Sequence, residues 1–377
     1  MFQWAIERSG VSPTDLERRF PRLRQWRVGE ALPTLRQLEA FARATSTPFG
    51  YLFLSEPPIE KLPIPHFRTL GDEEPTQRPT PDLLETVQLM ERRQAWMRDF
   101  LIDQGQDPMP FVRSAQIDDD SHEFAGRIRH TLGLADDWAE ERPSWTDALR
   151  HLQEAMDQAG ILVVVNGIVG NNTHRRLKPA EFRGFVLVDE YAPLVFVNGA
   201  DGKAAQMFTL AHELAHVWLG SSAAFDLREL QPANDRTERA CNRVAAEFLV
   251  PELKLREVWV SIRREPEPFQ AIARVFKVSA IVGARRALDV GLVTKPEFLG
   301  FYQAYQDDER RSAARRSEGG NFYATQRLRI GRRFGDAVVR AAGEGRLLFT
   351  EAYQLTGLYG RAFERYAARL GYARRRG

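Results

Sequence analysis

The sequence has few or none of several features, each of which would indicate a particular class of protein. Among 377 residues there is one cysteine, Cys241, which excludes an internal disulfide framework and suits a reducing compartment. No apolar run approaches the about 20 residues that a membrane-spanning helix needs. The opening segment MFQWAIERSG carries charge and lacks the apolar core of a signal peptide. We therefore expect a cytoplasmic protein with no membrane partner.

An excess of one charge is missing as well. The 53 lysines and arginines nearly balance the 51 aspartates and glutamates. Such a balance gives no global field that would favour nucleic acid or an acidic membrane surface. The hydrophobic content of 43% is ample for globular cores. A chain of this length is too long for one ordinary core and fits two or three domains.

Prolines and the spacing of apolar residues divide the chain into four regions. Each proline fixes φ and removes a backbone donor, so the stretch SEPPIEKLPIPHF cannot be helical. After this joint, Thr80 can cap a helix that has Pro81 at its first position. The regions are short helices at 1–56, the joint and a helical linker at 57–119, a mixed region at 120–260 and a helical region at 261–377.

In the mixed region the apolar period changes from that of helices to that of strands. A helix ends at Gly160, and three apolar segments separated by turn residues follow it. These segments are ILVVV at 161–165, RGFVLVD at 183–189 and PLVFVNG at 193–199. We interpret PLVFVNG as an edge strand, whose free backbone groups could pair with an extended peptide.

The next segment, FTLAHELAHVWLG from Phe208 to Gly220, is apolar on almost every side but carries two histidines and a glutamate. In an α-helix, positions i and i+4 lie about 40° apart around the axis, so His212 and His216 can offer nitrogens to one metal ion. Glu213 is rotated by about 100° from His212, so it is a poor ligand but can reach a water bound to that ion. This HExxH pattern predicts a catalytic zinc site with Glu213 as the general base.

A catalytic zinc needs a third protein ligand and an open fourth position. No third histidine follows within a short span, so a carboxylate is the candidate. Glu238 and Glu247 lie on opposite faces of a second helix, and helical spacing favours Glu238 without choosing uniquely. Asn242, one turn beyond Glu238, could hydrogen-bond to a ligand. The acids that follow the motif are Asp226, Glu229, Asp235, Glu238, Glu247 and Glu252.

Other readings of these residues are open. The helix could be inert, with its polar groups satisfied internally. Cys241 could be a ligand or a redox sensor, but one buried thiol is more often a packing residue. His174, in the turn NNTHRR, could stabilise an oxyanion, although an exposed loop histidine is the simpler interpretation. A set of two histidines and a glutamate accepts Zn²⁺ or Mn²⁺, and the affinity order favours Zn²⁺.

Together, FTLAHELAHVWLG and the later ERACNRVAAEFLVP resemble the ImmA/IrrE metallopeptidases, zinc-dependent endopeptidases of the gluzincin type that cleave helix-turn-helix repressors. The resemblance covers roughly residues 120–295. It implies an α+β fold, in which a gluzincin-like domain of a small sheet and the HExxH helix is flanked by helical N- and C-terminal domains. It also implies zinc bound by His212, His216 and Glu238. The implied function is cleavage of a helix-turn-helix repressor, which would derepress stress, phage or mobile-element genes.

Residues 1–56 resemble a degenerate Xre-type helix-turn-helix domain, a common N-terminal partner of this peptidase. The recognition helix is cut short, because Pro21 stands where it should begin. Arg22, Arg24 and Arg27 belong to a basic cluster that could contact DNA phosphates, or could lie on the solvated face of a domain that docks a protein. The competing class of function is therefore a DNA-binding regulator or an antitoxin-like partner with an idle or structural metal site. The C-terminal region has no assigned chemistry.

Overall fold

The structure is a computed structural model that describes residues 1–60, 79–221, 223–225, 236–307 and 322–372. The rest of the proline-rich joint, from 61 to 78, and the acids Asp226, Glu229 and Asp235 lie outside the described residues. The chain forms two compact units. Among the described residues, the first comprises 1–60 and 79–89, and the second comprises those from 90 to 372. None of the described helices is both long enough and apolar enough to cross a membrane.

The first unit is helical and is built around a small aromatic core. Phe20, Trp26 and Phe41 are buried there, and the Phe20 and Phe41 rings meet edge to face at 5.7 Å. Helix α4 begins with a capping box between Thr34 and Gln37, which satisfies backbone donors at its first turn. The elements are α1 (Phe2–Ser9), α2 (Pro13–Arg19), α3 (Leu23–Val28), α4 (Leu35–Ala44) and the 3-10 helix η1 (Phe49–Phe53).

Helix α5 (Pro81–Asp103) contributes residues to both units, and its start is capped as the sequence predicts. The Leu83 amide donates to Thr80 Oγ1 at 3.3 Å. Two helices, five strands, the HExxH helix α8, a sixth strand and helix α9 follow. They are α6 (Ser121–Thr131), α7 (Trp145–Gln158), β1 (Leu162–Asn166), β2 (Ile168–Val169), β3 (Asn172–Arg176), β4 (Gly184–Leu187), β5 (Leu194–Asn198), α8 (Lys203–Leu219), β6 (Ala223–Phe225) and α9 (Arg236–Leu249).

Only helices follow α9 in the described part of the chain. They are α10 (Glu252–Ile262), α11 (Pro268–Phe276), α12 (Ala280–Asp289), α13 (Lys295–Asp307), α15 (Phe322–Ile330), α16 (Arg332–Gly343), α17 (Phe349–Thr356) and α18 (Arg361–Arg369). The combination of one small sheet with helical N- and C-terminal regions confirms the predicted α+β class.

The sheet has the strand order β1-β5-β4-β6. Strand β5 is parallel to β1, with Val163 beside Val195, and antiparallel to β4, with Phe196 beside Phe185. The interpretation of PLVFVNG as an edge strand is therefore wrong, because β5 has a hydrogen-bonded neighbour on each side. In the described sheet the edges are β1 and β6.

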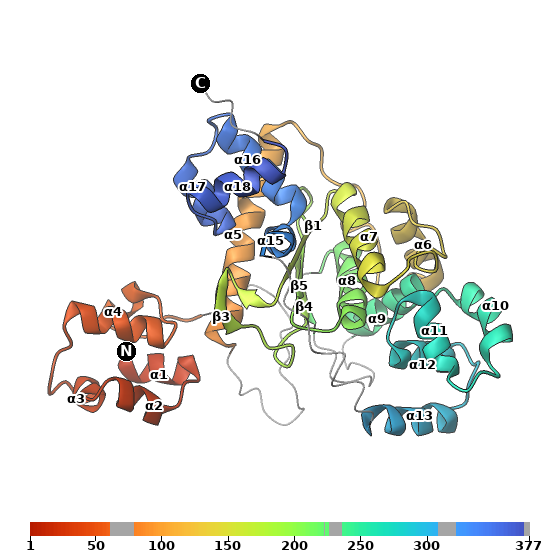
Figure 1. Cartoon of the computed structure of the whole chain (residues 1–377), viewed down its shortest axis with the longest axis horizontal. Helices are drawn as coiled ribbons and strands as arrows, with labels where there is room; N and C mark the ends of the chain where they lie inside the picture. The colour runs from red at the N-terminus through yellow and green to blue at the C-terminus, as the bar shows by residue number, and fades with distance from the viewer. Residues whose placement is uncertain (61–78, 222, 226–235, 308–321, 373–377) are drawn as a thin grey trace. The chain divides into compact units, whose positions relative to one another are not determined.

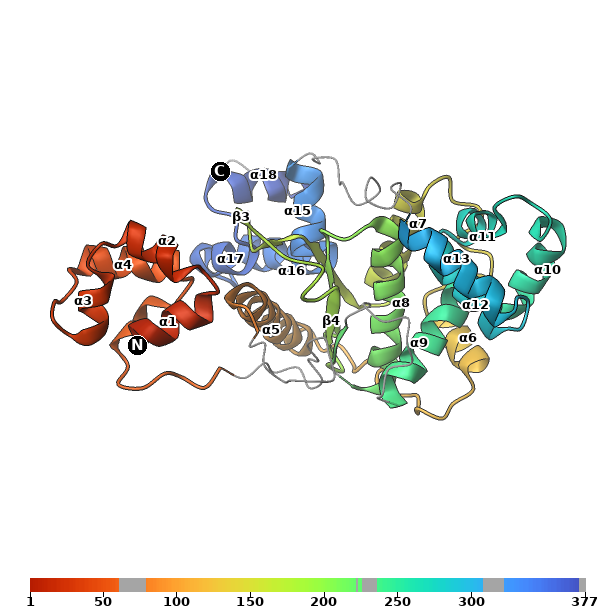
Figure 2. The ribbon, with the colours of Figure 1, turned by 90° about the horizontal axis from the view of Figure 1, so that it is seen from below.

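Helices cover the sheet on both faces. In Figures 1 and 2, α7 and α8 lie on one side of the strands, while α15 and α16 lie on the other. Val163, Val165 and Val197 share one core cluster with α8, whereas Val164 lies 3.6 Å from the position that a Cβ of Gly331 would occupy. Strands buried on both faces read as continuous apolar runs, which is the pattern of ILVVV and PLVFVNG.

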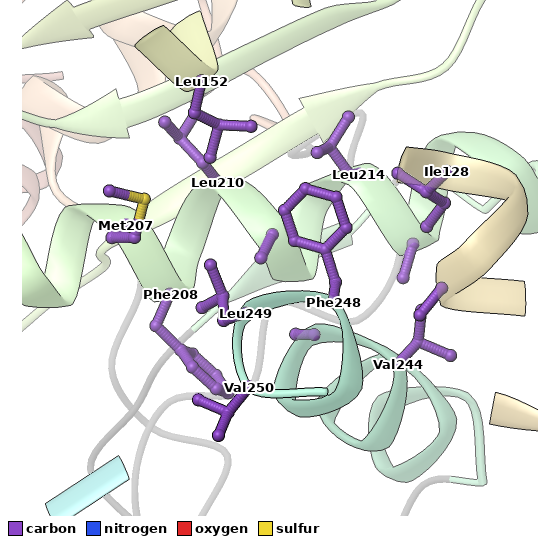
Figure 3. Close-up of a cluster of buried hydrophobic side chains, with 14 of the residues drawn as sticks. Ile128, Leu152, Met207, Phe208, Leu210, Leu214, Val244, Phe248, Leu249 and Val250 are labelled. Carbon is purple, nitrogen blue, oxygen red and sulfur yellow. The ribbon is translucent and has the colours of Figure 1, made fainter. Parts of the chain in front are cut away.

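Helices α8 and α9 pack against each other through an apolar interface. Figure 3 shows Phe248 pointing from α9 toward α8 beside Leu214, with Val244 on the same side of α9. Ile128 of α6 closes one end of this cluster. The packing fixes the distance between the helix that carries the histidines and the helix that carries Glu238.

A separate antiparallel ribbon is formed by β2 and β3. It contains His174, which lies on β3 and is exposed. The expectation that His174 lies in a turn is therefore wrong, although its exposure agrees with the simpler interpretation of this residue.

Candidate metal centre

Helix α8 carries the HExxH residues in its buried central part. His212, Glu213 and His216 are each at most 1% exposed. The helix ends at Gly220, which adopts a left-handed conformation with φ of 76° and donates its amide to His216 O at 2.9 Å. Glycine is suited to this C-terminal position because it has no Cβ to strain the backbone.

The two histidines and Glu238 converge on one point. His212 Nε2 and His216 Nε2 are 3.0 Å apart, and each lies close to one Glu238 oxygen, at 3.2 Å and 3.3 Å respectively. Ligands held at about 2.0–2.2 Å around a tetrahedral metal lie roughly 3.3 Å from one another. The three donor atoms therefore have the chemistry and the spacing of three corners of a tetrahedral zinc site.

The other ring nitrogens of both histidines have polar partners. His212 Nδ1 lies 3.0 Å from Asn242 Oδ1, and His216 Nδ1 lies 2.9 Å from Ser221 Oγ. A carboxamide oxygen can only accept, so Nδ1 of His212 carries the proton and Nε2 presents its lone pair to the centre. Asn242 of α9 thus contacts the ring of His212 on α8.

Charge at the centre is set by burial and by these contacts. Burial lowers the pKa of His212 against the opposing effect of Glu238. For Glu238, burial acts to raise the pKa, but the contacts with the imidazoles of His212 and His216 outweigh it and lower the pKa below its usual range. A neutral His212 imidazole facing an ionised Glu238 carboxylate has the protonation states that a divalent cation requires.

Glu213 lies beside this centre without joining the cluster. Neither of its carboxylate oxygens has a hydrogen-bond partner among the residues that the structure describes. Burial raises its pKa well above the usual value, and the negative charge of Glu238 adds to the effect. A fully buried carboxyl group without a protein partner costs free energy unless something else contacts it. Its place fits a group that exchanges a proton with a molecule bound at the centre.

The alternative ligand, Glu247, is engaged elsewhere. Its carboxylate forms an ion pair with Arg286, and its Oε1 lies 2.9 Å from His122 Nδ1. The Glu252 amide donates to the same carboxylate at 3.3 Å. Glu247 therefore joins α9 to α6 and α12 and does not face the histidines.

The remaining candidates lie away from this cluster. Cys241 is fully buried in the main core, as expected for a packing residue. Arg22, Arg24 and Arg27 are exposed on the first unit, where Arg24 donates to Glu17 at 2.7 Å and 3.0 Å.

Two residues near the centre are not predicted from the sequence. Gly184 at the start of β4 faces α8, because an added Cβ would lie 2.8 Å from Phe196 O and 3.5 Å from Glu213 Oε1. Ser221 is the other, through its contact with His216. Neither belongs to the i, i+4 pattern of the motif, but the position of Ser221 directly after a helix-ending glycine is a signal that could have identified it.

The small sheet and the HExxH helix are those of a metal-dependent peptidase, and a comparison with protein-family models identifies the family. Residues 156–288 match the IrrE N-terminal-like domain of peptidase family M78, and this range includes His212, Glu213, His216 and Glu238. This domain therefore belongs to the ImmA/IrrE family of metallopeptidases. Residues 330–369 match a domain of unknown function, DUF8813. No curated protein matches the chain.

Proposed function

We propose that the chain is a zinc-dependent endopeptidase of the HExxH, gluzincin type. The observation that carries the proposal is the convergence of His212, His216 and Glu238 beside the buried and unpartnered carboxyl group of Glu213. Together these residues provide three ligands for a metal ion and a nearby group that can move a proton. The peptidase family of this domain supports the same conclusion.

The roles of the residues follow from their places. Zinc held by His212, His216 and Glu238 would polarise the scissile carbonyl and lower the pKa of a water. Glu213 accepts the proton of the attacking water and later donates it to the leaving amine. Asn242 keeps the Nδ1 proton of His212 in place, so that Nε2 stays directed at the centre.

We propose a helix-turn-helix repressor as the substrate and the cytoplasm as the place where the two proteins meet. The support is the match of the domain to the ImmA/IrrE family, because the resemblance to that family implies such a substrate. Cleavage would derepress stress, phage or mobile-element genes.

The test compares new protein N-termini in cells that express the wild-type chain, Glu213→Gln or Glu123→Gln, with and without DNA damage. Glu123 is an exposed glutamate on α6 and provides the control for the same chemical change. We expect a terminus that appears with the wild type and with Glu123→Gln but not with Glu213→Gln. In vitro, loss of the proton-transfer group should lower kcat by about 10²–10⁴-fold while the metal stays bound. Identical profiles in all three strains would reject the peptidase proposal and favour the regulator.

For residues 1–56, several observations favour docking of a protein over reading of DNA. Helix α3 has six residues, and a helix in the major groove must present three or four side chains to base edges. Val28, the last residue of α3, and Leu32, four residues further on, are 69% and 89% exposed. Apolar side chains on a surface favour contact with a protein.

A binding assay with duplex DNA tests this second proposal. The full-length chain is compared with the double variant Arg22→Ala, Arg27→Ala over a range of salt concentrations. We expect only weak binding that differs little between sequences. Tight, sequence-dependent binding that the double variant loses would establish the DNA-binding role instead.

A further inference from the structure

His216 is held by a residue that lies outside its own helix. Ser221 Oγ is 2.9 Å from His216 Nδ1, and the Ser221 amide also donates to His216 O at 3.2 Å. Ser221 thus contacts both the ring and the backbone of one residue. The ring is thereby held from the side opposite to Nε2, which faces Glu238.

The turn that carries Ser221 is fixed by its surroundings. Gly220 has a left-handed φ, and a Cβ at this position would collide with Arg113. The Arg113 amide donates to Val217 O at 3.2 Å, and the Ala115 amide donates to Trp218 O at 3.0 Å. A segment that precedes α6 therefore caps the last turn of α8, directly before Ser221.

The two histidines have partners of different chemistry. An amide oxygen such as that of Asn242 can only accept a hydrogen bond, whereas a hydroxyl group can both donate and accept. Only when Ser221 accepts from Nδ1–H does His216 Nε2 have a lone pair for a cation. The 2.9 Å between Ser221 Oγ and His216 Nδ1 is a hydrogen-bond distance, so the position of Ser221 allows this arrangement.

We propose that Ser221 is a positioning residue for His216, which fixes both the orientation and the Nδ1–H tautomer that metal binding needs. The proposal rests on the proposed function, in which His212, His216 and Glu238 hold a metal ion. Removal of a hydrogen-bond partner of a ligating histidine typically lowers metal affinity by about 10–100-fold. We expect a loss of this size on removal of the Ser221 hydroxyl group.

The test measures Zn²⁺ affinity by competition with a chelator for the wild type, Ser221→Ala, Ser221→Thr and Ser261→Ala. Ser261 is exposed on α10 and donates to Val258 O, so it controls for the loss of a serine hydroxyl group far from the centre. We expect Ser221→Ala to bind Zn²⁺ about 10–100-fold more weakly. Ser221→Thr retains the hydroxyl group, so its affinity should stay close to that of the wild type, as should that of Ser261→Ala.

Two further readouts separate positioning from a general structural role. The melting temperature of each metal-free protein should be unchanged, and ¹⁵N NMR of the zinc-loaded wild type should show His216 protonated at Nδ1. Equal affinity of Ser221→Ala and the wild type would overturn the proposal, as would a loss of affinity matched by a loss of metal-free stability. Glu238→Gln serves as the reference for the centre itself. If the wild type bound no Zn²⁺, or if Glu238→Gln bound Zn²⁺ with the same affinity as the wild type, the metal centre would be rejected. The role of Ser221 would then be rejected with it.

Discussion

At the scale of single residues, Glu238 and Glu247 show how position on one helix determines what a carboxylate does. Both lie on α9. Glu238 lies 3.2 Å and 3.3 Å from the Nε2 atoms of two imidazoles, whereas Glu247 is buried in an ion pair with Arg286. Burial lowers the pKa of Arg286, but the guanidinium group stays charged and needs its partner. The first carboxylate is therefore suited to a metal ion and the second to the joining of helices.

The variants Glu238→Gln and Glu247→Gln should fail in different ways. For Glu238→Gln we expect Zn²⁺ affinity to fall by more than the about 10–100-fold that the loss of an outer partner costs. For Glu247→Gln we expect a loss of about 3–5 kcal/mol in the free energy of unfolding, because Arg286 becomes an unpaired buried charge. Chelator competition and urea unfolding of both variants measure the two effects. Release of the metal by folded Glu247→Gln, with retention by Glu238→Gln, would show that the ligand is misassigned.

At the scale of elements, the end of α8 depends on a glycine that has no room for a side chain. Gly220 and Gly105 both have positive φ, of 76° and 69°, but an added Cβ collides with Arg113 only at Gly220. The left-handed backbone costs a residue with a Cβ about 1–2 kcal/mol at either site. The free energy of unfolding of Gly220→Ala should fall by more than this amount. The variant should also bind Zn²⁺ more weakly, because the turn carries Ser221. Thermal unfolding and chelator competition are the measurements, with Gly105→Ala as the matched control. Equal stability losses in the two variants would contradict this account of the turn.

The sequence predicts these elements where the signal is local. The spacing of His212 and His216 follows from helical geometry, and Glu238 and Glu247 lie together on one helix, α9, as the sequence predicts. The place of β5 between β1 and β4 could not be predicted, because strand order depends on contacts between distant segments. Spacing alone also could not separate Glu238 from Glu247. That choice depends on Arg286 and His122, which reach Glu247 from other helices.

At the scale of the whole second unit, the C-terminal helices meet the peptidase domain at Asp157. Burial raises the pKa of this carboxyl group to about 7, against the lowering effect of Arg332 and Arg333 on α16. Between the usual pKa of 3.8 and about 7, the folded protein holds a proton that the unfolded chain has lost. The stability from this group is therefore fully present below the lower value and is lost as pH rises through the higher one.

The variant Asp157→Asn tests this pH dependence, since an amide resembles the protonated acid in shape and charge. We expect the melting temperature of the wild type to fall relative to that of the variant as the pH rises from about 5 to 8. The measurement is thermal unfolding of both proteins across this range. A difference between them that stays constant with pH would mean that Asp157 does not titrate there.

The C-terminal helices should also unfold together with the metal centre. Helices α15 and α16 pack on β1, and Gly331 between them lies so close that a Cβ would come to 3.0 Å from Val163 O. Phe334 is buried on α16 and meets Trp96 of α5 edge to face at 5.6 Å. These contacts make α15, together with the start of the region that matches DUF8813, one cover of the sheet, opposite to the cover formed by α8.

Truncation of one buried ring in this cover should therefore destabilise the metal centre as well. We expect Phe334→Ala to cost about 3–5 kcal/mol and to lower the melting temperature of the transition that Zn²⁺ raises. Phe349→Ala, at a position that is 47% exposed on α17, is the control and should change this melting temperature little. Calorimetry of the wild type and both variants, with and without Zn²⁺, makes the comparison. If Phe334→Ala shifted only a transition that does not respond to Zn²⁺, the C-terminal helices would be an independent domain. A shift of the zinc-linked transition means that the sheet needs both of its helical covers to hold the centre together.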